Sequence, residues 1–338
     1  MEGLTQLLNQ SVINDTTTED LTQCHESAST RLFFIAANSL VFLVGFLLNG
    51  FIFKFYLCQR QKLSKIMMIY LKNLTAADFL LSLSLLFYII DSASSSMTIR
   101  LAYCNFGSAM FYLNMYASML FMAHIAYNRY LKIVHPLKTH KLQTVRAACI
   151  ISTVTWVFYM SVLAIFVSVS LVTQRRPASI PNSCLYLHST KTSAVLKMIH
   201  IGKTTNFLCV LVFMVYVYYR TSREVSVAQQ NQTTSPNSKK LVQSRRNMTV
   251  LVSVFCVCFI PYHVVHLPYI FLGCSQSQVF YFLKELTLVF SALNVCLDPF
   301  IYFIFCKDFR EQLKNTFCLR KDSPAPTVET GIRQGQVS

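Results

Sequence analysis

Charged residues and glycine are both scarce in this chain. Asp, Glu, Lys and Arg make up only 13% of its 338 residues, about half of the roughly 25% that soluble domains carry. With 8 glycines and 9 prolines, it is neither a fibrous protein nor a flexible low-complexity one. No internal repeat is visible, which counts against the repeated architecture of many transporters. What remains is 54% apolar residues, more than we expect a soluble core of this length to bury.

Catalytic signatures are missing as well. We find no nucleophile–base signature, no pair of carboxylates placed to flank a substrate cleft and no glycine-rich phosphate loop. We therefore expect that the chain is not an enzyme. Acidic residues are few, 14 against 30 Lys and Arg, which gives a net charge of +16. Such an excess is one mark of nucleic-acid binding, so its position in the chain must decide its meaning.

The apolar residues gather in seven long runs. Each run exceeds the ~18 residues that indicate a transmembrane helix rather than a buried one. The runs cover residues 33–57, 66–90, 102–127, 147–172, 195–219, 248–272 and 279–305. The sequence thus predicts an all-α membrane protein, a seven-transmembrane helix bundle whose two termini lie on opposite sides of the membrane.

The charges between the runs predict the orientation. Basic residues concentrate after the first, third, fifth and seventh runs, and Lys and Arg are enriched in cytosolic loops. Examples are Arg60, Lys65, Lys138, Arg146, Arg223, Arg246, Lys307 and Arg320. The acidic N-terminus should then be extracellular, and most of the positive charge serves orientation and contact with inner-leaflet membrane lipids. We expect no nucleic-acid partner.

This topology divides a multi-pass protein of the plasma membrane into four segments. The first 30 residues are polar and show no cleavable signal peptide, so the first run should act as a signal anchor. The N-terminal segment holds two glycosylation sequons, at Asn9 and Asn14. The segments are an extracellular N-terminal segment 1–30, the bundle 31–305, a membrane-surface helix 306–318 and a disordered cytosolic tail 319–338.

The membrane-surface helix is predicted from the periodicity after the seventh run. Phe309, Leu313 and Phe317 recur at every fourth position, and basic residues cover the other side. This pattern is typical of a short amphipathic helix on the inner leaflet. Cys318 ends the segment and is a candidate palmitoylation site.

The twelve cysteines do not form a dense disulfide framework, since most of them fall inside the runs or at their cytosolic ends. The topology places four outside the cell, namely Cys24, Cys104, Cys184 and Cys274. Two disulfides are expected in that oxidising compartment. Spacing alone leaves all three connectivities open.

Several polar side chains lie deep inside the runs, where polar groups are costly and usually functional. Asn114 and Ser118 share one helix face, as do Asn294 and Asp298, and Asp78 adds a second carboxylate. Two carboxylates with neutral oxygen donors predict a small-cation site. The alternative is an interhelical hydrogen-bond cluster that holds no ion.

Prolines interrupt two of the runs. Pro261 and Pro268 lie in the sixth run and Pro299 in the seventh. Proline removes a backbone donor and kinks a helix. Kinked helices can pivot, which suits a conformational switch, although static bending is the alternative.

Five motifs together make the chain resemble one family. They are Asn73–Asp78, Asn128–Tyr130 followed by Val134–Leu137, Trp156, Cys258–His263 and Asp298–Tyr302. Their order, spacing and topology resemble those of rhodopsin-like (class A) G-protein-coupled receptors over residues of about 30–318. The resemblance implies a receptor that activates a heterotrimeric G protein and binds arrestin. It places the switch at Asn128, Arg129, Tyr130, Phe259, Pro261, Asp298, Pro299 and Tyr302.

A narrower resemblance is to the ADP/UDP-sugar branch of purinergic nucleotide receptors, with its orphan and lysophospholipid neighbours. It is carried by Phe111–Tyr116, Pro261–His263, Leu283–Leu288 and Asn294–Pro299, and by Asn206 in place of the usual proline. It implies the disulfides Cys104–Cys184 and Cys24–Cys274, and G proteins of the inhibitory type. It also implies a structural sodium ion, and no other cofactor, at Asp78, Asn114, Ser118, Asn294 and Asp298.

The chain departs from the family pattern at several positions. Asn128 replaces the usual acid before Arg129, and Leu241 stands where many relatives carry an acid. Both changes predict a weak ionic lock and measurable ligand-free signalling. Phe259 replaces the common tryptophan and Met214 the tyrosine that helps hold the active state. His266 stands where the branch commonly has arginine, which weakens the case for a nucleotide.

The outer half of the bundle is basic and aromatic. By the resemblance, Lys284, His263 and His266 face inward. Lys203 has no obvious acidic partner on neighbouring runs, and aromatic surface and hydroxyl donors come from Tyr112, Tyr116 and Tyr269. These seven are the predicted ligand residues. Cations beside aromatic rings suit a phosphate-bearing ligand with a planar base or a lipid tail. We therefore expect an extracellular anionic small molecule, a nucleotide or nucleotide sugar, with a lysophospholipid or an orphan, constitutively active receptor as alternatives. The residues also allow purely structural roles, such as hydrogen bonds between helices for the histidines and a surface ion pair with a loop acid for Lys284.

Two other functions are weaker. His263 and His266 are three residues apart and His200 could face them, which would suit a proton or zinc sensor. A light-sensing opsin needs a lysine deep in the seventh run, where this chain has Ala292, because Lys284 lies too near the surface.

Overall fold

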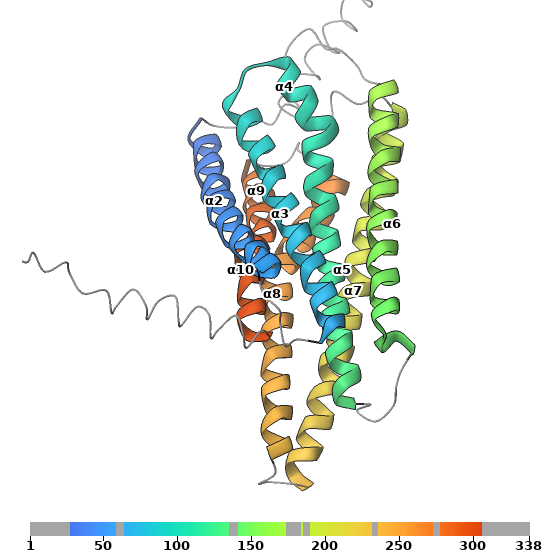
Figure 1. Cartoon of the computed structure of the whole chain (residues 1–338). Coiled ribbons are helices and arrows are strands. Elements are labelled where there is room, and N and C mark those ends of the chain that lie inside the picture. Colours follow the sequence, from blue (N-terminus) through green and yellow to red (C-terminus); the bar gives the residue numbers. More distant parts are fainter. Residues whose placement is uncertain are drawn as a thin grey trace, which may run out of the picture.

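The computed structural model describes residues 28–58, 64–134, 141–173, 184, 190–231, 236–272 and 278–305. Within these ranges the long elements are all α-helices, and they run side by side as one bundle (Figure 1). The helices are α2 (Ala28–Cys58), α3 (Lys65–Ala93), α4 (Met97–Ala102), α5 (Ser108–Val134), α6 (Val145–Val172), α7 (Thr190–Asn231), α8 (Pro236–Leu272), α9 (Gln278–Ala292) and α10 (Asn294–Phe305). A π-helical turn, Tyr103–Gly107, joins α4 to α5.

The seven predicted spans are confirmed, because the described ranges contain seven helical segments that are long and apolar enough to cross a membrane. Two helices are longer than the apolar runs indicated. The fifth run was expected at 195–219 and the sixth at 248–272, whereas α7 covers Thr190–Asn231 and α8 begins at Pro236. Their extra turns are polar, so hydropathy could not find them, and they project beyond the other helices at the bottom of Figure 1.

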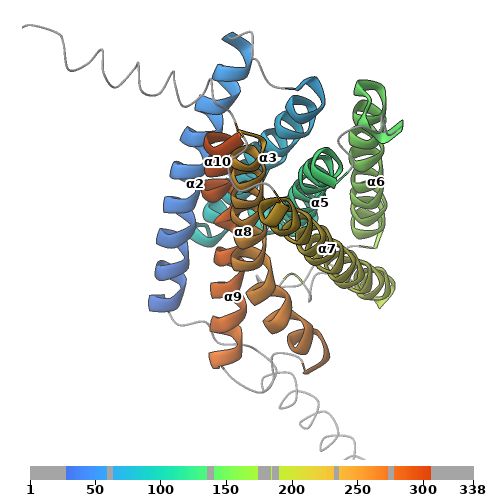
Figure 2. The same cartoon turned by 90° about the horizontal axis from the view of Figure 1, so that it is seen from below.

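The helix α5 forms the centre of the bundle. In the span Met97–Val134, 72% of the most apolar window is buried, against 17% in the span on α7 and 22% in the span on α6. The outer helices therefore turn most of their apolar side chains away from the protein, as expected for contact with lipid. Viewed end-on, α3, α6 and α7 lie around α5, and α10 lies between α2 and α8 (Figure 2).

The prolines do not interrupt the helices where the sequence predicted. Pro261 and Pro268 lie inside a continuous α8, and Pro299 lies inside α10. The seventh span is instead divided at Leu293, between α9 and α10. Pro299 cannot donate to the carbonyl of Val295 four residues earlier, and the Asn49 Nδ2 of α2 donates to that carbonyl at 2.8 Å. A side chain from another helix thus replaces the lost backbone bond.

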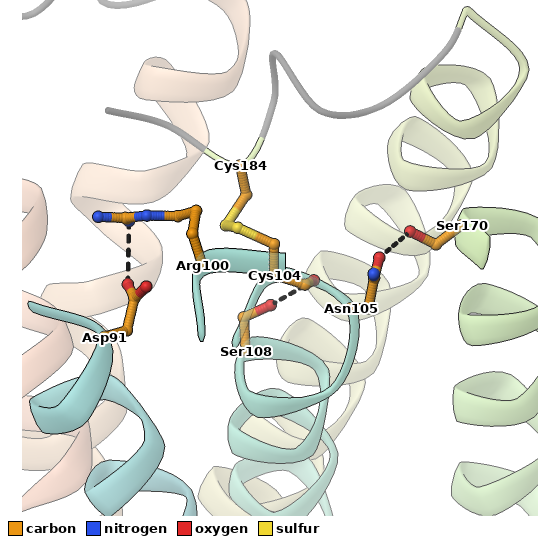
Figure 3. The surroundings of a disulfide bond; sticks show 7 residues. All are labelled: Asp91, Arg100, Cys104, Asn105, Ser108, Ser170 and Cys184. Carbon is orange, nitrogen blue, oxygen red and sulfur yellow. Dashed lines mark hydrogen bonds and ion pairs between the residues drawn. A yellow bond between two sulfur atoms is a disulfide. The ribbon is translucent and has the colours of Figure 1, made fainter. Parts of the chain in front are cut away.

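The outer end of α5 is anchored by a disulfide between Cys104 and Cys184, whose Cα atoms are 5.4 Å apart (Figure 3). Around it, Arg100 pairs with Asp91 at 2.9 Å, and the Ser170 hydroxyl donates to the Asn105 amide oxygen at 2.6 Å. Gly107 is required here because an added Cβ would lie 2.8 Å from the Tyr103 ring. The π-helical turn is thereby tied to α3 and α6.

Several predicted features lie outside the described residues. They are the glycosylation sites Asn9 and Asn14, the second disulfide Cys24–Cys274, the amphipathic helix 306–318 and the palmitoylation site Cys318. They stay predictions.

Candidate functional site

A buried polar cluster joins α3, α5 and α10 at mid-bundle. Ser118 donates to Asp78 Oδ1 at 3.2 Å or to Asp298 Oδ2 at 3.3 Å. The Asn294 amide nitrogen lies 3.0 Å from Ser118 Oγ and 3.4 Å from Asp78 Oδ1. All four side chains are fully buried. The structure therefore brings together four of the five residues predicted for a sodium site.

The donor set of this cluster fits a small hard cation. Within the described part of the chain, Asp78 Oδ2, Asp298 Oδ1 and Asn294 Oδ1 accept no hydrogen bond. Two buried carboxylates without a cation or a shared proton would repel each other strongly. Surplus oxygen acceptors around two carboxylates are what Na⁺ requires. Asp78, Ser118, Asn294 and Asp298 are the residues that would hold it.

Asn114, the fifth residue predicted for the sodium site, makes its hydrogen bond outside this cluster. Its amide nitrogen donates to the Met110 carbonyl of its own helix at 2.8 Å. Its Oδ1 is buried and accepts no hydrogen bond from any described residue. The oxygen is thus available on the same face as Ser118, although no contact joins Asn114 to the other four residues.

The inner half of the bundle holds the predicted switch residues. The Tyr302 hydroxyl donates to the Leu71 carbonyl at 2.9 Å and accepts from Thr75 at 2.8 Å, which ties α10 to α3. On α5, Asn128 is buried, and its Oδ1 accepts no hydrogen bond among the described residues. Arg129 follows it and is half-buried, while Tyr130 is buried, with its ring 6.5 Å from that of Tyr216 on α7.

An aromatic floor crosses the bundle above this region, made by Tyr116, Phe207, Phe259 and His263. The backbone oxygen of Phe259 can only accept, so the contact of 2.8 Å makes His263 Nδ1 the donor. His263 Nε2 then accepts from the Tyr116 hydroxyl at 2.8 Å. The His263 ring also stacks on Phe207 with centroids 3.7 Å apart. Both ring nitrogens of His263 are thus hydrogen-bonded within the protein. His263 therefore positions Tyr116 and does not offer a free donor to a ligand.

Above the floor, α7 and α8 carry a cluster of cations and imidazoles. Lys203 Nζ lies 3.5 Å from the centre of the Tyr112 ring, a cation–π contact. Among the described residues, no Asp or Glu pairs with Lys203. His266 Nε2 lies 3.3 Å from His200 Nδ1, and the His266 ring stacks on Tyr262 at 4.8 Å. A positive charge thus meets aromatic faces with no carboxylate to neutralise it.

Lys284 on α9 is engaged differently. Its Nζ contacts Oε1 of the neighbouring Glu285 at 2.5 Å and lies 5.4 Å from the Tyr281 ring centre. The alternative for Lys284 was a surface pair with a loop acid, whereas the structure pairs it with the buried Glu285 of its own helix. Tyr269 lies on α8, but its side chain is outside the described part.

Sequence reasoning missed two residues of this region. Phe207, which stacks on His263, lies one turn after Lys203 on the same helix face, and that spacing could have found it. Glu285 is 7% exposed, and it lines a cavity of about 20 Å³ between α2, α3, α5 and α9 together with Tyr88, Tyr103 and Tyr112. Such a cavity has room for about one water molecule. No pattern in the sequence indicated that this carboxylate is buried.

Comparison with known proteins agrees with this architecture. Residues 48–302 match the family described as 7 transmembrane receptor (rhodopsin family). Purinoceptor 14 of Bos taurus is 32% identical over 81% of this chain and 82% of its own length. G-protein coupled receptor 87 of Mus musculus is 30% identical over 88% of this chain and 83% of its own length. Purinoceptor 13 of Homo sapiens is 31% identical over 84% of this chain and 80% of its own length.

These relatives are receptors and not enzymes. Three observations now agree, namely seven membrane-spanning helices, the motifs at their ends and a family match that covers most of the bundle. They support a multi-pass protein of the plasma membrane that couples to a G protein and binds a small molecule. The chain therefore belongs to the rhodopsin-family seven-transmembrane receptors, as a class A G-protein-coupled receptor of the purinergic branch with its orphan neighbours.

Proposed function

We propose that this receptor binds an extracellular anionic ligand, a nucleotide or nucleotide sugar, and activates a heterotrimeric G protein of the inhibitory type. The site lies between α5, α7, α8 and α9, above the floor of Tyr116, Phe207, Phe259 and His263. The observation that carries the proposal is Lys203. Its ammonium lies over Tyr112 within the bundle and pairs with no described carboxylate. Removing such a charge from water is costly unless an anion compensates for it.

The surroundings of Lys203 fit a phosphate-bearing ligand with a planar base. His200 lies one turn before Lys203 on α7 and contacts His266 of α8, and both imidazoles can donate to phosphate oxygens. The rings of Tyr112 and Tyr262, which Lys203 and His266 now cover, would add aromatic contacts to the ligand if those side chains turn toward it. Two relatives are named purinoceptors, which is consistent with such a ligand. Lys284 would join the site only if the ligand competes with Glu285 for it.

Binding would act as a population shift rather than a reaction. An anion held by Lys203, His266 and Lys284 would draw the outer ends of α8 and α9 inward. The inner end of α8 would then swing outward, and Arg129 would help to admit the C-terminal helix of the G protein. The Tyr302 contacts with Leu71 and Thr75 would have to break in the same transition.

Further features belong to the same proposal. The N-terminus is extracellular and glycosylated at Asn9 and Asn14, and Cys24 pairs with Cys274. Sodium binds at Asp78, Ser118, Asn294 and Asp298, with Asn114 beside them. The helix 306–318 lies on membrane lipids with Cys318 palmitoylated, and arrestin binds the active receptor.

The test is a panel of nucleotides, nucleotide sugars and lysophospholipids applied to cells that express the receptor, with G-protein dissociation as the readout. We compare Lys203→Met with Lys197→Met, because Lys197 lies on the same helix but is exposed. A hydrogen bond to a charged group is worth about 1.5–3 kcal/mol, so Lys203→Met should weaken the potency of the active compound roughly 10- to 150-fold. Lys197→Met should leave it within about twofold.

If the active compound kept its full potency on the Lys203→Met receptor at equal surface expression, the assignment of Lys203 to the ligand site would be contradicted. A response to lysophospholipids without any response to nucleotides would contradict the nucleotide assignment, and the charge requirement at Lys203 would then be measured with the lipid. Blocking the response with a toxin specific for inhibitory-type G proteins tests the coupling.

A further inference from the structure

Two histidines from different helices face each other near the outer end of the bundle. Nδ1 of His200 on α7 and Nε2 of His266 on α8 are 3.3 Å apart, and the ring centroids are 5.1 Å apart. A nitrogen–nitrogen contact of this length exceeds the 2.9–3.0 Å typical of an N–H hydrogen bond. The direct bond between the rings is therefore weak and can be replaced by a better partner.

The separation of the two nitrogens is the one that a shared zinc ion requires. Zn²⁺ binds histidine nitrogen at about 2.0–2.1 Å in tetrahedral geometry, which places two such nitrogens roughly 3.3–3.4 Å apart. The distance between His200 Nδ1 and His266 Nε2 thus matches this range, and each imidazole has to turn about its side-chain torsions to aim its lone pair at a common ion. A neutral imidazole with its lone pair toward a metal is also the commonest metal ligand in proteins.

The other side chains around this pair set the strength of the site. His263, one turn before His266, is committed to Tyr116 and Phe259 and cannot serve as a third ligand. The described residues contain no group of three His, Cys, Asp or Glu side chains that could hold a metal. Lys203, one turn after His200, adds a repelling charge. The site is therefore a two-histidine site with open positions for water, weaker than a four-ligand structural site.

We propose that His200 and His266 form a zinc-binding site that joins α7 to α8. His200 is half-buried, so an ion can reach the pair from the outer side of the bundle. Bound zinc would tie together two helices whose relative movement the receptor uses for signalling. The inference concerns a metal and does not depend on the anionic ligand proposed above, although both would use His266.

The test measures thermal unfolding of the purified full-length receptor with increasing ZnCl₂, and with MgCl₂ as the control for ionic strength. Because a ligand of the folded state raises stability with concentration, zinc should raise the melting temperature of the receptor by a few degrees while magnesium does not. His200→Ala and His266→Ala should each abolish the zinc effect. The matched control is His124→Gln, because His124 lies on α5 and contacts Thr155 of α6 rather than α7 or α8, and this variant should retain the effect.

Two further variants keep the test decisive if the alanine variants fold poorly. His200→Cys replaces one zinc ligand by another and should preserve zinc stabilisation. Lys203→Met removes the repelling charge and should lower the zinc concentration needed for half of the effect several-fold. The same variant weakens the response to an anionic ligand, so the two proposals fail in distinguishable ways.

The inference is overturned if zinc up to millimolar concentration leaves the melting temperature unchanged. It is equally overturned if the alanine variants retain the zinc effect, or if His124→Gln loses it together with them. A visible absorption band of bound Co²⁺ that is present in the receptor and absent in the double variant would support nitrogen coordination directly.

Discussion

At the scale of single residues, Asp78 and Asp298 provide the two carboxylates of the proposed sodium site. Both carboxylates are fully buried and share the Ser118 hydroxyl, and each has one oxygen without a described donor. An ion bound there would connect α3, α5 and α10 and would stabilise the folded state more as its concentration rises.

We therefore expect the receptor to melt at a higher temperature in NaCl than in choline chloride of equal concentration. Asp78→Asn should remove the difference between the two salts, because the neutral amide leaves only one carboxylate to hold a cation. Thermal unfolding of purified protein in both salts measures this. Equal melting temperatures for the wild type in the two salts, or a sodium effect that survives in Asp78→Asn, would refute the sodium site.

Asn49 stabilises the fold by donating a hydrogen bond to the Val295 carbonyl, which Pro299 leaves without a backbone donor. Asn49→Ala should destabilise the receptor by about 1–3 kcal/mol, because the Val295 carbonyl would then be buried and unpaired. The control is Asn38→Ala, since the buried Asn38 amide donates to the carbonyl of Phe34 within its own helix at 2.8 Å. Melting temperatures measured side by side should fall clearly more for Asn49→Ala than for Asn38→Ala, and equal losses would argue against the replacement bond.

At the scale of the elements, the close approach of α2 to α10 depends on a glycine. A Cβ added to Gly45 would lie 2.3 Å from Val295 Cγ2, whereas one added to Gly50 on the same helix meets nothing within 4 Å. The same Gly→Ala substitution can therefore be compared at a crowded position, Gly45, and at an open one, Gly50.

Gly45→Ala should lower stability by about 1–3 kcal/mol through overpacking. Gly50→Ala should be neutral or stabilise by about 0.5–1 kcal/mol, because alanine favours the helix. Thermal unfolding and the yield of folded receptor check both. A Gly45→Ala variant as stable as Gly50→Ala would show that α2 and α10 can separate at no cost.

The inner ends of α5 and α8 carry Asn128 and Leu241 at positions where the family resemblance leads us to expect acids. Asn128 is buried without a charge, and Leu241 stands near the start of the membrane-spanning part of α8. We expect ligand-free G-protein activation, and Asn128→Asp should reduce it several-fold by giving Arg129 a local counter-ion. Asn128→Gln keeps the side chain neutral and is the control. Basal dissociation of the G protein at matched surface expression is the readout, and an undetectable basal signal in the wild type would count against this expectation.

At the scale of the whole molecule, the prediction concerns orientation. The long polar turns of α7 and α8 carry basic residues on one side of the bundle, and the Cys104–Cys184 disulfide lies on the other (Figures 1 and 3). Because disulfides form in oxidising compartments, that side should face outward together with the N-terminus.

An epitope at the N-terminus should therefore be stained on intact cells, and one at the C-terminus only after permeabilisation. Enzymatic removal of N-linked glycans should shift the wild type on a gel, and the double variant Asn9→Gln/Asn14→Gln should show no shift. Staining of the C-terminal epitope on intact cells would reverse the topology.

Much of this architecture was predictable from the chain alone. The seven spans follow from apolar runs, and the clustering of Asp78, Ser118, Asn294 and Asp298 follows from motif positions on three helices. The true lengths of α7 and α8 were not predictable, because polar turns beyond the membrane have no hydropathy signal. The continuity of α10 through Pro299 was also missed, because the Asn49 side chain of another helix donates to the carbonyl that Pro299 leaves without a donor.

The sequence by itself determined the membrane bundle, the receptor family and the residue types of both polar sites. These depend on local hydropathy, on loop charge and on motif order, which are all written along one chain. The tertiary structure decided how those residues are used. It paired Lys284 with Glu285, engaged His263 with Tyr116, left Lys203 over Tyr112 and brought His200 against His266. Most of these contacts join different helices, and the pairing of the neighbours Lys284 and Glu285 places both in a partly buried site. Only packing in three dimensions could therefore decide which cation pairs with a carboxylate among the described residues and which lies over an aromatic ring instead.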